Sequence, residues 1–122
     1  MRAVLPGMVE RGWGRIVAVG AAVAGDPPPG LSAYAASKAA LNALVSVAAK
    51  ETIAAGVTVN AVLPTVIDTP ANRRAMPGAN PGSWVAPETL ADDIAWLAGE
   101  EAAGVTGGLF EVSSESKPLA AR

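Results

Sequence analysis

The sequence of 122 residues contains no histidine and no cysteine, and these two absences exclude several kinds of site. Without cysteine there are no disulfides, thiol nucleophiles or thiolate zinc sites. Without histidine there is no Ser-His-Asp triad, and most transition-metal sites lose their commonest ligand. The acidic residues are scattered along the chain, so no metal is expected.

Charge is also scarce, at 16% charged residues and a formal net charge of −2, and lysine and arginine form no run. A nucleic-acid partner is not expected, because a phosphate backbone is bound by clustered positive charge. The longest apolar run, residues 16–25, is shorter than the about 20 residues that cross a bilayer, so no membrane association is expected. It resembles a signal peptide only faintly, and the cytoplasm is the expected location.

Hydrophobic residues make up 51% of the chain, which is typical of one globular domain with a buried sheet. Apolar runs without alternation predict strands buried on both faces. Longer periodic stretches predict helices between them. In chain order the pattern predicts the end of a helix in residues 1–11, a strand at 15–19, a helix at 32–55, a strand at 57–62, a helix from Pro87 and a strand at 107–112. This alternation predicts an α/β fold with parallel strands and right-handed helical crossovers.

Local signals add detail to this prediction. Ser32 is expected to cap the long helix, and Gly56 to end it. Residues 64–83 contain three prolines after Pro64 and are predicted to be one long irregular, functional segment. The polar tail after Val112 is expected to fray.

Residues 34–38, which read YAASK, carry the most informative chemistry. Positions i and i+4 share one face of a helix, so the Tyr34 phenol and the Lys38 ammonium can point into one cleft. A neighbouring ammonium favours the phenolate, which makes Tyr34 able to exchange a proton without histidine. Ligands of parallel sheets bind beyond the carboxyl ends of the strands, where the loops at 20–31 and 63–83 also begin. Without this context, a tyrosine and a lysine at this spacing would be an ordinary surface pair.

Four segments in this order resemble the second half of the short-chain dehydrogenase/reductase family. They are GRIV at residues 14–17, the Y-x-x-x-K pair of Tyr34 and Lys38, VNAVLP at 59–64 and VTGG at 105–108. The resemblance implies the C-terminal half of a Rossmann-like doubly wound parallel sheet, as a single partial domain over residues 1–122. It also implies a small-molecule substrate and a homo-oligomer formed through the alanine-rich helix that follows Tyr34.

The resemblance further implies a role for each matching residue. Tyr34 would donate the proton in an NAD(P)-dependent reaction, and Lys38 would also bind the nicotinamide ribose. Pro64, Ile67 and Thr69 match positions on the nicotinamide side of the cofactor site. Thr65 stands where the family usually has glycine, a departure that affects close backbone approach to the cofactor.

Ala21 lies 13 residues before Tyr34, where most of the family has a catalytic serine, and Gly20 and Ala22 offer no hydroxyl either. Residues 63–73, LPTVIDTPANR, are similar to the dihydropteridine reductase-like subgroup, which also lacks that serine. This favours hydride transfer to a conjugated or quinonoid, dihydropteridine-like substrate. Two alternatives remain: a 3-oxoacyl-carrier-protein-reductase-like or other carbonyl reductase, and a non-catalytic remnant or interaction module.

The family's phosphate-binding glycine loop has no counterpart in this sequence, since no G-x-x-x-G-x-G follows a predicted strand. The resemblance therefore places the adenine half of the cofactor site outside these residues. It leaves the choice between NAD and NADP open, and it leaves binding of either by this chain alone in doubt. The strand at 15–19 is also expected to lack one neighbour and to expose an edge.

Overall fold

The computed structural model describes residues 1–122, and its three strands form one parallel sheet in the order β1-β2-β3. The strands are β1 (Gly14–Val19), β2 (Val57–Pro64) and β3 (Leu109–Val112). β1 pairs with β2 over its whole length, and β3 pairs with the last four residues of β2. The predicted α/β fold with three parallel strands is confirmed, and β1 lies at one edge of the sheet.

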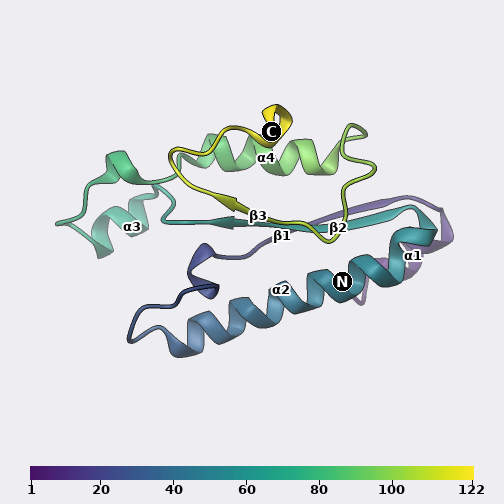
Figure 1. The fold of residues 1–122 in the computed structure, drawn as a ribbon, viewed down its shortest axis with the longest axis horizontal. Helices are drawn as coiled ribbons and strands as arrows, with labels where there is room; N and C mark the ends of the chain where they lie inside the picture. The colour runs from purple at the N-terminus through teal and green to yellow at the C-terminus, as the bar shows by residue number, and fades with distance from the viewer.

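Helices cover both faces of the sheet (Figure 1). The long helix α2 (Ser32–Thr52) connects β1 to β2 on one face, and α4 (Pro87–Ala98) connects β2 to β3 on the other. The short helix α1 (Leu5–Glu10) precedes β1 and packs into the same core cluster as α2. None of these helices combines the length and apolar character that crossing a bilayer requires.

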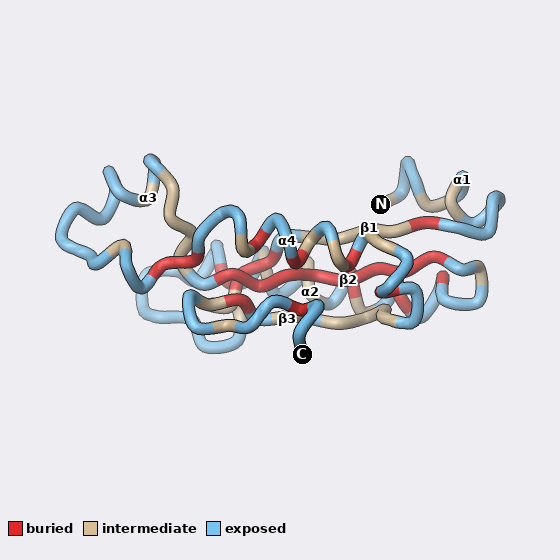
Figure 2. Tube along the Cα trace, turned by 90° about the horizontal axis from the view of Figure 1, so that it is seen from above, coloured by how far each residue is buried: buried red, intermediate tan, exposed pale blue.

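β2 is the centre of the molecule, because every one of its residues is buried (Figure 2). Alternate side chains of a strand point to opposite faces of the sheet. Accordingly Val57, Val59, Ala61 and Leu63 pack in the cluster that contains α2, whereas Val62 packs in the cluster that contains α4. Burial on both faces explains why the sequence of this strand lacks simple alternation.

α2 ends as predicted but begins differently. After the 3-10 turn η2 (Ile53–Ala55), Gly56 adopts a left-handed conformation with φ of 71°, which a side chain would strain. At the other end, Ser32 is already the first helical residue and Leu31 occupies the cap position without a side-chain hydrogen bond. The prediction that Ser32 caps the helix is therefore wrong.

Residues 64–83 are not one irregular segment, since they contain the helix α3 (Pro70–Ala75) and the 3-10 turn η3 (Pro81–Ser83). Thr69 Oγ1 accepts a hydrogen bond from the Asn72 N–H at 3.1 Å, and Pro70 takes the first helical position. A helix of six residues is too short for a clear hydrophobic period, so only a threonine followed by proline could have signalled its start in the sequence.

The C-terminal tail is also ordered, contrary to the expectation that it frays. It ends in the 3-10 turn η4 (Leu119–Ala121), and Leu119 is buried in the cluster with α4. The Leu119 N–H donates to Asp93 Oδ1 at 2.7 Å, and Asp93 is itself buried in the middle of α4. One apolar anchor and one buried hydrogen bond therefore help to fix a tail whose other residues are mostly polar.

Candidate active site

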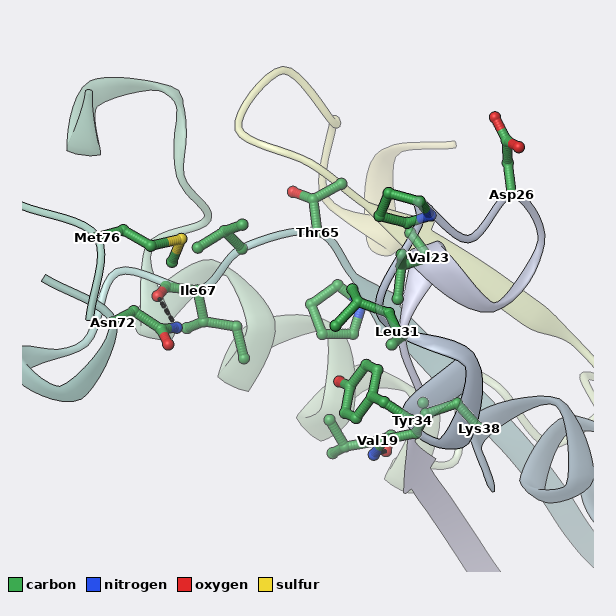
Figure 3. Close-up of a pocket in the computed structure, with 16 residues that line it drawn as sticks. Val19, Val23, Asp26, Leu31, Tyr34, Lys38, Thr65, Ile67, Asn72 and Met76 are labelled. Atoms are coloured by element: carbon green, nitrogen blue, oxygen red, sulfur yellow. Dashed lines mark hydrogen bonds between the residues drawn. The ribbon is translucent and has the colours of Figure 1, made fainter. Parts of the chain in front are cut away.

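A cavity of about 850 Å³ opens beyond the carboxyl ends of β1 and β2. The loop after β1, the first turns of α2 and the segment after β2 supply its lining (Figure 3). These three segments are far apart in the sequence, and the parallel register of β1 and β2 brings them to one edge. Apart from a few polar groups, the lining is mainly apolar, as in most small-molecule sites.

Tyr34 and Lys38 both line this cavity, as their spacing predicts. Tyr34 lies in the first turn of α2, is 47% exposed, and turns its hydroxyl toward the space enclosed by the cavity walls (Figure 3). Lys38 Nζ lies 5.8 Å from the centroid of the Tyr34 ring and donates to the Val19 carbonyl at 3.0 Å. The carbonyl at the end of β1 thus holds the ammonium beside the phenol.

Ala21 lies on the Tyr34 side of the cavity and is only 5% exposed. It leads into the 3-10 turn η1 (Ala22–Ala24), and neither Gly20 nor Ala22 carries a hydroxyl. Ser37, although close in sequence, is exposed, and its Oγ donates to the Tyr34 carbonyl at 2.7 Å. The wall beside Tyr34 therefore offers no serine that could polarise a carbonyl.

The opposite wall begins where β2 ends, at Pro64, and continues through Ile67. Both residues line the cavity. The Ile67 carbonyl accepts a hydrogen bond from Asn72 Nδ2 at 2.8 Å, whereas the Ile67 N–H has no partner within the chain. One backbone donor therefore remains for an amide oxygen of a ligand, which fits a nicotinamide carboxamide.

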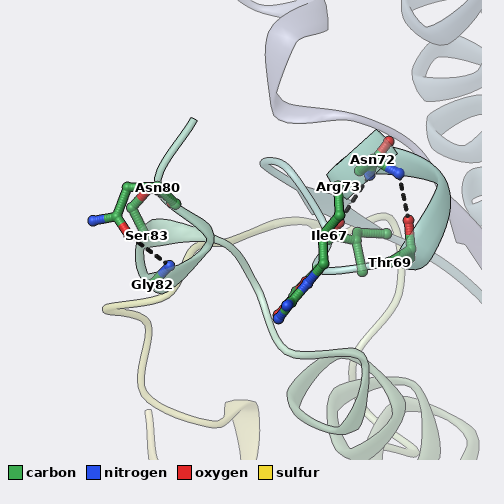
Figure 4. Close-up of polar contacts among 8 residues, drawn as sticks. Ile67, Thr69, Asn72, Arg73, Asn80, Gly82 and Ser83 are labelled. Carbon is green, nitrogen blue, oxygen red and sulfur yellow. Dashed lines mark hydrogen bonds and ion pairs between the residues drawn. The ribbon is translucent and has the colours of Figure 1, made fainter. Parts of the chain in front are cut away.

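The remaining residue assigned to this side from the sequence, Thr69, is not part of the cavity lining. Its Oγ1 accepts the Asn72 N–H as the cap of α3, although its hydroxyl proton remains free to donate (Figure 4). Asn72 does line the cavity, although no pattern in the sequence predicted a role for it. Its only signal was its position three residues after a cap threonine, which places it in the first turn of an unrecognised helix.

An ion pair between Asp68 and Arg73 stabilises the segment that carries Asn72. Arg73 Nε donates to Asp68 Oδ1 at 2.6 Å and Arg73 Nη2 donates to Asp68 Oδ2 at 2.7 Å. These hydrogen bonds hold the pKa of Asp68 below its ordinary value and raise the pKa of Arg73. The bidentate pair joins the residue before Thr69 to the body of α3.

Comparison with known proteins gives a consistent picture. Residues 1–80 match the sequence profile of the family described as short chain dehydrogenase. The chain is 38% identical over 120 residues to the 3-oxoacyl-[acyl-carrier-protein] reductase FabG of Pseudomonas aeruginosa, in an alignment that covers 92% of this chain and 49% of that protein. The chain thus spans about half the length of the curated relatives it matches.

Solved structures agree in fold. A short chain dehydrogenase/reductase family protein superimposes with a TM-score of 0.86 at 38% identity, covering 93% of this chain and 49% of that one. A putative NAD(P) dependent gluconate 5-dehydrogenase from Beutenbergia cavernae, with bound NADP, superimposes with a TM-score of 0.84 at 28% identity and the same coverage. The three-layer arrangement around β1, β2 and β3 is therefore shared with these proteins.

Proposed function

The chain belongs to the short-chain dehydrogenase family, and we propose that it carries the proton-transfer and nicotinamide-side residues of an NAD(P)-dependent oxidoreductase. The observation that carries the proposal is the position of Tyr34. Its hydroxyl faces a mainly apolar cavity at the carboxyl ends of parallel strands, with the Lys38 ammonium beside its ring. A nicotinamide cofactor, when bound, supplies the hydride, and the chain must then exchange the matching proton.

In this proposal Tyr34 donates that proton to the substrate. Lys38 favours the phenolate that remains, since an opposite charge nearby stabilises it. Its ammonium, which donates to the Val19 carbonyl, would also bind the ribose hydroxyls of a cofactor. Pro64 and Ile67 would hold the nicotinamide, with the free Ile67 N–H as a donor. Thr69, which caps α3 and lies outside the cavity lining, would donate its hydroxyl proton to the carboxamide of the nicotinamide.

Two substrate classes are supported by different observations. The absence of a hydroxyl around Ala21 favours a conjugated or quinonoid, dihydropteridine-like substrate, whose delocalised ring system accepts hydride with less help from a polarising donor. The similarity to the Pseudomonas aeruginosa reductase favours the alternative, a 3-oxoacyl-type or other carbonyl reductase. We place the conjugated substrate first, because the missing donor is a property of this cavity itself.

Several associated properties are proposals as well. NAD and NADP are both candidates. The two cofactors differ only in their adenosine half, and the cavity residues assigned here would contact the nicotinamide half. The exposed Leu44 and Val47 of α2, with Ile53 of η2 beside them in the chain, support a homo-oligomer formed through this helix. We place the protein in the cytoplasm, consistent with its composition and its short apolar runs.

The test is a comparison of the chain with its Tyr34→Phe variant, using NADH and NADPH titrations followed by steady-state assays. We expect the variant to bind the cofactor normally and to lose roughly 10²–10⁴-fold in turnover, since general acid catalysis typically contributes this much. Unchanged turnover in the variant would refute the role of Tyr34 as proton donor. If the wild-type chain binds neither dinucleotide, the rival proposal of a non-catalytic interaction module gains support.

A further inference from the structure

We propose that Asn72 is a specificity-determining residue, whose Oδ1 accepts a hydrogen bond from a ring N–H of a planar substrate. The proposal rests on the proposed function in that the substrate is the molecule reduced beside Tyr34. Asn72 lies on the cavity wall opposite Tyr34 and projects from α3 toward the space that the Tyr34 hydroxyl also faces (Figure 3). It is half-buried, so its side chain is partly shielded from water.

The orientation of the Asn72 carboxamide follows from its neighbour. A backbone carbonyl can only accept, so the group 2.8 Å from the Ile67 carbonyl must be the Nδ2 donor. The oxygen Oδ1 is then the other end of the amide, and it has no hydrogen-bond partner in the chain. The bond from the Asn72 N–H to Thr69 Oγ1 fixes the backbone at the same residue.

The polar groups of the cavity are therefore distributed unequally. The Tyr34 hydroxyl and the Lys38 ammonium are donors on one wall, and Asn72 Oδ1 is an acceptor on the other, where the Ile67 N–H is also free. Asp26 and Thr65 add a carboxylate and a hydroxyl to the lining. Apolar side chains, among them Val23, Leu31 and Met76, line much of the space between them. A flat ring with an acceptor toward Tyr34 and an N–H toward Asn72 satisfies both walls, whereas an alkyl ketone leaves Oδ1 unpaired.

A ring N–H and the exocyclic amide of nicotinamide offer the same donor chemistry, so the experiment must separate them. We would measure binding to the ¹⁵N-labelled 122-residue chain by NMR chemical-shift titration. The ring probes are 2-pyridone and N-methyl-2-pyridone, and the exocyclic probes are nicotinamide and N,N-dimethylnicotinamide. We expect the chain to prefer 2-pyridone over its N-methyl derivative by roughly 3- to 10-fold, the range of one net hydrogen bond.

Two variants separate recognition from a structural role of Asn72. Asn72→Leu and Asn72→Asp both lose the bond to the Ile67 carbonyl, but only Asn72→Leu loses the acceptor. We therefore expect the preference to disappear in Asn72→Leu and to persist in Asn72→Asp. Asn80→Leu is the matched control, since Asn80 bonds Gly82 in the same segment but lies outside the cavity lining (Figure 4). It should keep the full preference.

Three results would overturn the proposal. The wild type could bind 2-pyridone and its N-methyl derivative equally, or the two Asn72 variants could show the same preference. Alternatively, the Asn72 substitutions could change the binding of the nicotinamide probes only. The last would assign Oδ1 to the cofactor rather than to the substrate. A dinucleotide titration of the same samples keeps this question separate from the proposed function. Dinucleotide binding without a pyridone preference contradicts only the role of Asn72. A pyridone preference without dinucleotide binding supports that role and, for this chain alone, favours the non-catalytic module.

Discussion

At the scale of single residues, Ala21 is an important difference between this cavity and the family, because it stands where the family usually carries a catalytic serine. Ala21 is almost completely buried on the Tyr34 side of the cavity, and no neighbouring residue of the loop compensates with a hydroxyl. Because serine adds only one oxygen, it fits most readily of the polar residues at a buried alanine. The position therefore allows a direct test of the substrate class.

We predict that Ala21→Ser raises turnover of simple ketones but leaves turnover of a quinonoid dihydropterin nearly unchanged. The new hydroxyl would polarise a carbonyl, and one such donor is worth about 10²–10³-fold in comparable sites. Steady-state kinetics with both substrates measure the ratio. Gly25→Ser, in the same loop but outside the cavity lining, is the control for added polarity alone. A ratio that does not move would argue against polarisation at this position.

The residue scale also shows how far sequence patterns predict a site. The Tyr34–Lys38 pair follows from helical spacing alone, and the carboxyl ends of β1 and β2 do bring it to a cavity with Ala21, Pro64 and Ile67. Asn72 could not be predicted, because its role depends on a bond to Ile67 and on the turn of a helix too short to show periodicity. Short polar contacts of this kind depend on backbone geometry rather than on residue order.

At the scale of elements, α3 depends on local polar contacts, since none of its residues is buried. The bidentate contact of Arg73 with Asp68 holds the pKa of Asp68 below its ordinary value. A lowered folded-state pKa means that the pair stabilises the folded chain at pH values above the ordinary Asp pKa, 3.8. This contribution is lost as the pH falls through the lowered pKa.

We therefore predict that α3 loosens at acidic pH before the sheet does, with a midpoint below 3.8. Carboxyl NMR of Asp68 should give this midpoint directly, and amide exchange of residues 71–75 should report the loosening of the helix. The Arg73→Gln variant should return the Asp68 midpoint to its ordinary value, whereas Arg74→Gln should not, because Arg74 makes no such pair. An equal effect of both variants would show that general charge, and not the bidentate contact, lowers the pKa.

The β2–β3 connection depends instead on one fully buried amide. Asn60 Nδ2 donates to the Val105 carbonyl at 2.8 Å, and Asn60 Oδ1 accepts from the Gly108 N–H at 3.0 Å. Asn60 thereby anchors the segment that leads into β3 from the centre of β2. An asparagine inside an apolar strand pattern is tolerated here because both ends of its amide are paired.

We predict that Asn60→Ala lowers the free energy of unfolding by roughly 2–4 kcal/mol, because two buried backbone groups lose their partner. Urea denaturation followed by circular dichroism measures the change. Asn80→Ala serves as the control, since the exposed Asn80 bonds only its own turn, and its expected cost is below about 1 kcal/mol. A small loss at Asn60 would mean that the segment before β3 can find other partners.

At the scale of the whole molecule, alternation of elements predicted the layered arrangement well. The three strands, their parallel order and the helices on both faces all follow from the sequence of apolar runs and breaks. The ordered C-terminal tail could not be predicted in this way, because it is held by a hydrogen bond between Leu119 and Asp93, which are 26 residues apart in the sequence. Long-range contacts of single residues leave no periodic signal in the chain.

The same scale includes surfaces that the fold leaves uncovered. Leu44 and Val47 of α2, and Ile53 in the 3-10 turn η2 that follows it, are each at least 50% exposed, while Val45, Ala48 and Ala49 of α2 pack into the core. A long helix with apolar residues on its outer side favours contact with another surface, and small alanines nearby allow close approach. These three residues support the proposed homo-oligomer through α2.

We predict that the double variant Leu44→Lys with Val47→Lys is a monomer at concentrations where the wild-type chain self-associates, as measured by sedimentation velocity. Both side chains point away from the sheet, since they are about half exposed, so their replacement leaves the core intact and the unfolding midpoint nearly unchanged. Ala103→Lys, an exposed position after α4, controls for the added charge. If the double variant associates as strongly as the wild type, the contact between chains lies elsewhere. The free edge of β1 is then the next surface to test, because unpaired strand edges can also pair between chains.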